Sequence, residues 1–175
     1  VMFPRLRKFL TGDEANAAIE AGFLFPVMVA ILCGMIDMGV ALITNLKVTT
    51  ATQIVSDLLA RDKSVTDAQI DDAVNAGRLA LFPYDTATYG VDIVGIQYVG
   101  TGLVPTVRWR ETINMAENAA VLERSEGLGL QNEGVIAVTV RYFFTPYFSG
   151  FMINDIQMHE EAYVRGRKGL FVQKE

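Results

Sequence analysis

Only a few side chains in this chain could carry out catalysis or bind a metal. Its 175 residues include one cysteine, Cys33, and one histidine, His159. One residue of each type cannot form an intrachain disulfide or a Cys/His zinc site. His159 is followed by Glu160 and Glu161, and a carboxylate could orient it as a general base. A lone strand histidine is more often a surface residue, and we find no further groups with the spacing of a catalytic site.

Known catalytic and phosphate-binding motifs are also missing from the sequence. It contains no P-loop, no dinucleotide-binding glycine motif, no Gly-x-Ser-x-Gly and no His-Glu-x-x-His. Asp71 and Asp72 are adjacent and would diverge on a helix, which favours compensation of the helix dipole over metal binding. A net charge of -5 argues against nucleic acid as a partner. We therefore predict no catalytic, cofactor-binding or metal-binding residues, and expect that the protein is not an enzyme.

Two carboxylates stand in the most hydrophobic part of the chain. Between residues 17 and 43 the only charged side chains are those of Glu20 and Asp37. As a helix this range would extend roughly 40 Å, more than the roughly 30 Å of a bilayer's hydrocarbon core. It therefore predicts a transmembrane helix. A cleaved secretory signal is the alternative, but its apolar region is only about 7 to 15 residues long.

Each of the two carboxylates lies toward one end of the predicted span, where it could reach interfacial water. A second interpretation is pairing with a neighbouring subunit, because acidic groups buried in membranes are usually functional. For Glu20 both interpretations stay open. For Asp37 we expect hydration at the interface.

One face of the predicted span carries small residues. Spacings of three and four residues place on it Pro26, Ala30, Gly34, Asp37 and Ala41. Such a face lets helices approach closely in lipid, where packing drives association. We take these five residues and Glu20 as candidates for contact with other membrane subunits, in a homo- or hetero-oligomer.

Basic residues on either side of the span predict its orientation. Arg5, Arg7 and Lys8 precede it, whereas Lys47 is the only basic residue shortly after it. The positive-inside rule then favours a cytoplasmic N-terminus. The predicted organisation is a cytoplasmic segment and candidate leader at 1–16, a transmembrane helix at 17–43, and an exported domain at 44–175.

Two helical patterns follow the span. Leu46, Ile54, Leu58 and Leu59 predict that the membrane helix continues with an apolar stripe that packs on the domain. Thr66 and Gln69 have the spacing of a capping box, which predicts a second helix that ends before Pro83. Its expected buried side comprises Ile70, Ala73, Val74 and Leu79.

Beyond Pro83 the hydrophobic pattern alternates, which is typical of strands. The predicted strands are Val91–Val99, Thr106–Ile113, Val135–Phe144 and Ile156–Val164. In the third strand we expect Ala137, Thr139 and Arg141 to face water, and between strands two and three a short helix over 116–124. The predicted fold is α+β: a long N-terminal transmembrane helix and a roughly four-stranded antiparallel sheet, covered on one face by helices.

The start of the chain resembles a known family. Ala17-Ala18-Ile19-Glu20, then Pro26, then Gly34-Met35-Ile36-Asp37 is similar to the N-terminal signature of TadE/TadF-like pilus assembly proteins. Later segments are also similar to these proteins. They are residues 64–85, residues 142–147 with Thr145-Pro146, and residues 156–167 with Tyr163-Val164-Arg165.

The resemblance implies a type IV pilin-like minor subunit or assembly factor of the tight-adherence (Tad) pilus. It also implies a bacterial inner-membrane anchor, with a pilin-like domain in the periplasm. Glu20 would match the acidic fifth position of the mature chain, so that prepilin peptidase would cut between Ala15 and Asn16. This chain has Ala15 where the family usually has glycine, and an uncut chain would be a stationary single-span subunit.

Two further function classes stay open. The first is an accessory single-span subunit of another inner-membrane complex, respiratory or photosynthetic, built on a TadE-like protein. The second is an anchored periplasmic ligand-binding module or enzyme. The second is less favoured because we find no convergent group of polar residues.

Overall fold

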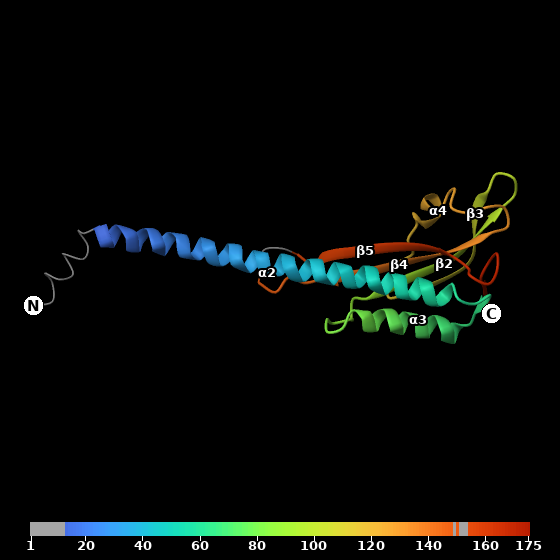
Figure 1. Cartoon of the computed structure of the whole chain (residues 1–175), viewed down its shortest axis with the longest axis horizontal. Helices are drawn as coiled ribbons and strands as arrows, with labels where there is room; N and C mark the ends of the chain where they lie inside the picture. Colours follow the sequence, from blue (N-terminus) through green and yellow to red (C-terminus); the bar gives the residue numbers. More distant parts are fainter. Residues whose placement is uncertain (1–12, 149, 151–153) are drawn as a thin grey trace, which may run out of the picture.

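A single helix, α2 (Asp13–Leu59), links the N-terminal part of the chain to a sheet domain (Figure 1). The structure is a computed structural model that describes residues 13–148, 150 and 154–175. Within α2, the range Ala17–Leu59 is long and apolar enough to cross a membrane. The prediction that the apolar helix runs on into the domain is thus confirmed, and this helix fits a single-pass membrane anchor.

The surroundings of α2 change at Asp37. Residues 17–36 of the helix, which we call the arm, extend beyond the domain and are almost wholly exposed (Figure 1). From Asp37 onward one side of the helix is buried against the sheet and a second helix. Its buried residues are Asp37, Thr44, Val48, Ala51, Thr52, Val55, Ser56 and Leu59.

This buried stripe is not the one that the leucines predicted. Leu46 is 67% exposed, Leu58 is also exposed, and only Leu59 of the predicted set is fully buried. The helix instead turns small and β-branched residues toward the sheet, because short side chains allow its backbone to lie close to the strands. Leu46 and Leu58 then lie on the outside of the helix.

The second helix, α3 (Asp67–Ala80), packs along α2 and begins at the predicted capping box. The Gln69 N–H donates to the Thr66 hydroxyl, and the Thr66 N–H donates to the Gln69 side chain. Ile70, Ala73 and Val74 are buried as expected, but Leu79 is 75% exposed. The fourth buried position is Gly77, where a Cβ would collide with Val55 and Tyr89. Continuing the spacing of three from Val74 leads to Gly77, so Leu79 lies on the outer side.

Four antiparallel strands form the main sheet, in the order β3-β2-β4-β5. They are β2 (Gly90–Val99), β3 (Val104–Ile113), β4 (Gly134–Phe144) and β5 (Ile156–Arg165). Every predicted strand is confirmed to within two residues at each end, and so is the α+β fold. The strands β4 and β5 lie against α2.

Both faces of the sheet are covered, which corrects the prediction of one wet face. The larger core lies between one face and the helices α2 and α3 (Figure 1). On the other face α4 (Val121–Arg124) and its flanking loops cover a second, smaller core. It consists of Val94, Ile96, Tyr98, Val121, Val135 and Ala137. Ala137 and Thr139, which we expected in water, are therefore buried, and Arg141 is half-buried.

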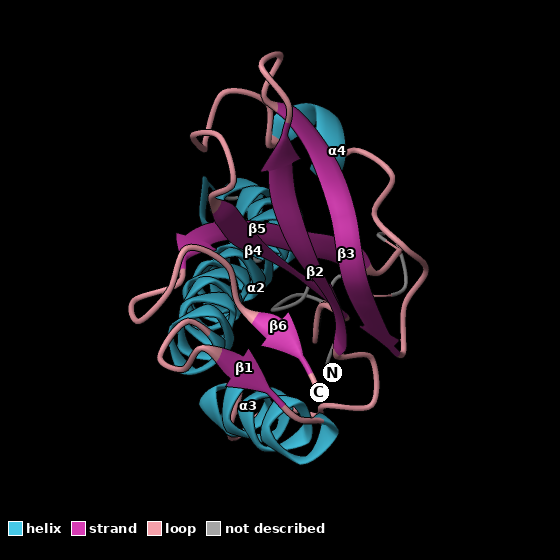
Figure 2. Ribbon diagram, turned by 90° about the vertical axis from the view of Figure 1, so that its right-hand side faces the viewer, coloured by secondary structure: helices cyan, strands magenta, loops and turns pink. Residues whose placement is uncertain are grey.

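A small parallel ladder that the sequence did not indicate joins the C-terminal tail to the helices. It pairs β1 (Ser64–Val65) with β6 (Gln173–Lys174), beside α3 (Figure 2). The Trp109 indole also donates to the Val172 carbonyl, at 2.8 Å. The tail thus completes the larger core, in which Val172 is buried.

Candidate functional site

The arm is the most unusual surface among the described residues. It carries large apolar side chains that are mostly exposed. Phe23 is 77% exposed, and Phe25, Met28 and Met35 are exposed to a similar degree. An exposed apolar surface this extensive marks a site of contact with a membrane or another protein. The first candidate functional site is therefore the arm and its junction with the sheet.

The predicted contact residues divide into groups along α2. Glu20, Pro26, Ala30 and Gly34 lie on the exposed arm, and a Cβ at Gly34 would meet no atom within 4 Å. Ala15 and Asn16, the predicted processing site, lie in the helical backbone of α2, but their side chains are outside what the structure describes.

Asp37 lies at the junction and contacts the chain's own sheet domain. Its side chain is buried, with the residue only 5% exposed. Its carboxylate accepts hydrogen bonds from the backbone N–H groups of Tyr147, at 2.9 Å, and Phe148, at 3.2 Å. These residues follow β4, so Asp37 ties the segment after this strand to the helix. The expectation that Asp37 would be hydrated at the interface is wrong, since the neighbouring segment covers it.

Ala41 lies one turn further along and is partly buried against the larger core. The small-residue face of α2 is thus divided by the fold. Asp37 and Ala41 contact the chain's own domain, whereas Pro26, Ala30 and Gly34 remain exposed. Within this face, the described residues that stay open to a partner helix are therefore Pro26, Ala30 and Gly34.

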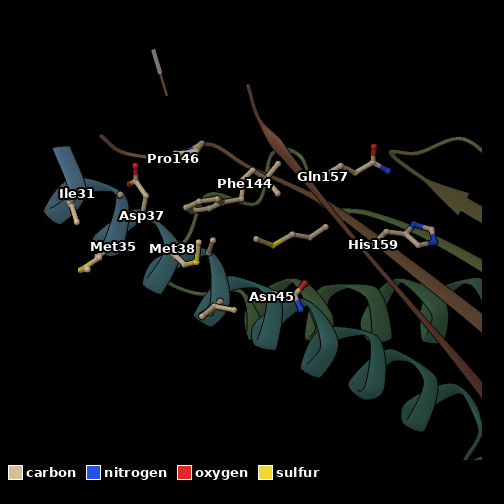
Figure 3. A pocket seen from close by; sticks show the side chains of 14 residues that line it. Ile31, Met35, Asp37, Met38, Asn45, Phe144, Pro146, Gln157 and His159 are labelled. Carbon is tan, nitrogen blue, oxygen red and sulfur yellow. The ribbon is translucent and has the colours of Figure 1, made fainter. Parts of the chain in front are cut away.

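A groove of about 960 Å³ opens at the junction (Figure 3). One wall is α2 between Ile31 and Asn45, and the other is formed by the end of β4 and the start of β5. The strand side includes Phe144, Pro146 and Met158. Figure 3 shows the Asp37 carboxylate directed toward the segment that carries Pro146. The groove is therefore lined mostly by apolar side chains, although an acidic residue stands at its edge.

A polar network on the outer face of the sheet is the second feature that the sequence left unexplained. The fully buried Asp92 accepts hydrogen bonds from Arg110, at 2.6 and 2.9 Å, and from the Asn118 N–H, at 2.8 Å. Arg110 also pairs with Glu117, at 3.0 Å. These contacts attach the segment between β3 and α4 to the sheet, so we assign them a structural role.

His159 belongs to the neighbouring part of this network. Its Nε2 lies 3.0 Å from Glu161 Oε1, so Glu161 is the carboxylate that orients it. Glu161 also accepts hydrogen bonds from Arg124, at 2.6 Å, from Asn118, at 2.6 Å, and from Tyr163, at 3.0 Å. A carboxylate with four such partners holds the outer-face segments together. This geometry favours the structural interpretation of His159.

The network should make the domain less stable at acid pH. Burial opposes ionisation of Glu161, but the hydrogen bonds from His159, Arg124, Asn118 and Tyr163 outweigh it and lower its pKa from 4.5 to about 2. Because the pKa of Glu161 is lower in the folded state than in the unfolded state, the ionised carboxylate stabilises the fold at pH values above the unfolded-state pKa. This stabilisation disappears as the pH falls from about 4.5 to about 2.

We expect Glu161→Gln to remove this acid-sensitive contribution, on the order of 2 kcal/mol. The free energy of unfolding, measured by urea titration between pH 7 and pH 2.5, should fall less steeply below pH 4.5 in the variant. Glu160→Gln is the matched control on the opposite side of β5 and should keep the wild-type slope. Equal slopes in wild type and Glu161→Gln would contradict the assignment.

Comparison with known protein families finds a match for the N-terminal part of the chain. Residues 16–56 match the family model described as TadE-like protein. The matched range covers the arm and most of the buried part of α2, including the Ala17-to-Asp37 signature on which the resemblance was based. Neither the curated proteins nor the solved structures contain a match to this chain.

Proposed function

We propose that this TadE-like chain is a minor pilin-like or assembly subunit of a Tad pilus, anchored in the bacterial inner membrane. The observation that carries the proposal is that the matched range coincides with an apolar helix, of which one half is exposed and the other is buried in a sheet domain. In this proposal the N-terminus is cytoplasmic and the sheet domain is periplasmic.

The subunit would act through contacts with other membrane subunits and with lipid. The exposed part of the small-residue face, at Pro26, Ala30 and Gly34, supports a close helix–helix contact in the bilayer. Glu20 is exposed on the same arm and could pair with a cationic group of a neighbouring subunit. In this view the sheet domain serves as a scaffold and not as a catalyst, since the polar network on its outer face is engaged in internal hydrogen bonds.

The exposed small face leads to a direct test of the contact. Gly34→Leu should lower the recovery of partner subunits in mild detergent by about fivefold, equivalent to about 1 kcal/mol, because the larger side chain blocks close approach. The substitution should leave the fold intact, since a Cβ there meets no atom within 4 Å. The measurement is quantitative mass spectrometry of the affinity-purified full-length protein.

Gly39→Leu is a matched control for this substitution. Gly39 is likewise in α2 with no atom within 4 Å of a Cβ, but five residues further on it points to the opposite side of the helix. Partner recovery should equal that of the wild type in Gly39→Leu. If both variants lose the partner equally, the contact does not use the small face.

A further inference from the structure

If the predicted span at 17–43 crosses the bilayer, the groove at the junction lies at the depth of one leaflet. Its helical wall, from Ile31 onward, belongs mainly to the predicted span at 17–43. The hydrogen bonds from Tyr147 and Phe148 to Asp37 hold the strand side at the level of residue 37. That level is about 9 Å before residue 43, measured along the helix axis. The end of the sheet is therefore expected to dip into the bilayer beside α2.

The side chains at this end of the sheet suit such a position. Tyr147 is 66% exposed, and Phe148 and Ile156 are exposed as well. Aromatic residues with one polar end are enriched where membrane and water meet. In water these side chains would form an unfavourable apolar patch, whereas near the lipid headgroups their exposure is favourable.

The groove changes in polarity along its length. Toward the centre of the bilayer it is lined by Ile31, Gly34 and Met38. At its other end the polar side chain that faces it is Asn45, because the Gln157 and His159 side chains turn to the outer face of the sheet (Figure 3). From Ile31 to Asn45 the helix rises roughly 20 Å, whereas one leaflet contributes roughly 15 Å of hydrocarbon. An apolar chain anchored by a polar group at the membrane surface matches both the length and the direction of this gradient.

We infer that the groove binds one acyl chain of a bilayer phospholipid, with the headgroup beside Asn45. A second copy of α2 is the alternative occupant; a 20 Å length of helix about 10 Å wide occupies roughly 1,600 Å³, so only part of its width could enter the 960 Å³ of the groove. The Asp37 carboxylate does not oppose an apolar ligand, since it is engaged by backbone N–H groups. The inference rests on the membrane anchoring in the proposed function.

Photolabelling from the lipid side tests the inference. The full-length protein is reconstituted in phosphatidylcholine nanodiscs that contain a phospholipid with a diazirine in one acyl chain, irradiated, and mapped by peptide mass spectrometry. We expect adducts on the arm and also on β5, at Ile156 or Met158, which lipid surrounding a bare helix would not reach. Gly34→Phe should lower the β5 adducts at least fivefold, whereas Gly39→Phe, on the opposite side of α2, should not.

The outcomes separate this inference from the proposed anchoring. Adducts on the arm without adducts on β5 would show that α2 spans the bilayer but that the groove holds no acyl chain. A second copy of the helix in the groove would give the same pattern, and it too would overturn the inference. The absence of adducts anywhere on α2 would instead overturn the anchoring itself.

Discussion

Replacing Asp92 by alanine is expected to destabilise the sheet domain by about 3 kcal/mol. Asp92 is fully buried and binds both Arg110 and the Asn118 N–H. Without the carboxylate, the mostly buried guanidinium of Arg110 loses its bidentate partner and the Asn118 N–H loses its acceptor. The remaining ion pair between Arg110 and Glu117 offsets part of this loss. We therefore expect a destabilisation at the lower end of the roughly 3 to 5 kcal/mol that is typical when one partner of a buried ion pair is removed.

Urea unfolding of the full-length protein in detergent micelles, followed by tryptophan fluorescence, measures this change. The only tryptophan, Trp109, precedes Arg110 in β3 and so reports on the same part of the sheet. Asp92→Asn should lower the free energy of unfolding less than Asp92→Ala does, since an amide oxygen still accepts one hydrogen bond. Asp72→Ala, at an exposed position of α3, should stay within about 0.5 kcal/mol of wild type. A loss below about 1 kcal/mol for Asp92→Ala would mean that the network contributes little to folding.

The Asp92–Arg110 pair left a signal in the sequence. Asp92 interrupts an apolar run in a predicted strand, and Arg110 lies in the next predicted strand. In the observed register Asp92 pairs with Thr112, so Arg110 is its diagonal neighbour on the same face. A charge inside an apolar strand requires a partner, and the adjacent antiparallel strand is the first place to search for one.

The strands themselves could be predicted because their pattern is local. In β4, Ile136, Val138 and Val140 alternate with smaller or polar residues, and this period of two defines the strand and its inner face. What covers the outer face is not local. Val121, in the short helix α4 between β3 and β4, packs there in one cluster with Val135 and Ala137. Alternation distinguishes two faces, but it does not reveal that a distant segment, α4 with its flanking loops, covers the second one.

The candidate site shows the same division between local and distant information. Periodicity places Pro26, Ala30, Gly34, Asp37 and Ala41 on one face of a helix, and the helix is confirmed. The partner of Asp37 could not be predicted, because the Tyr147 N–H is 110 residues away and a backbone donor has no side-chain signature. The buried stripe of α2 was missed for a related reason. Small residues are required on the buried side of α2 because the sheet packs close to its backbone. A hydrophobic pattern in the sequence does not indicate how close that packing is.

The contact at Asp37 gives the second large effect that we expect. In Asp37→Ala, the backbone amides of Tyr147 and Phe148 should exchange hydrogen about 100-fold faster, equivalent to about 3 kcal/mol for hydrogen bonds to a charged acceptor. The helix itself should not weaken, because alanine has a higher helix propensity than aspartate. Hydrogen exchange of the full-length protein in nanodiscs, read by mass spectrometry on peptides that include residues 145–148, measures the change.

Two variants decide whether the effect belongs to the carboxylate. Asp37→Asn keeps a neutral acceptor, so it should give an intermediate increase in exchange. Ile36→Ala, at the adjacent exposed position, should leave exchange at Tyr147 and Phe148 unchanged. Since α2 passes from the arm into the domain without a break, the connection after β4 is attached to the helix by side-chain contacts such as this one. Unchanged exchange in Asp37→Ala would show that other contacts hold this connection, and that Asp37 does not position the strand side of the groove.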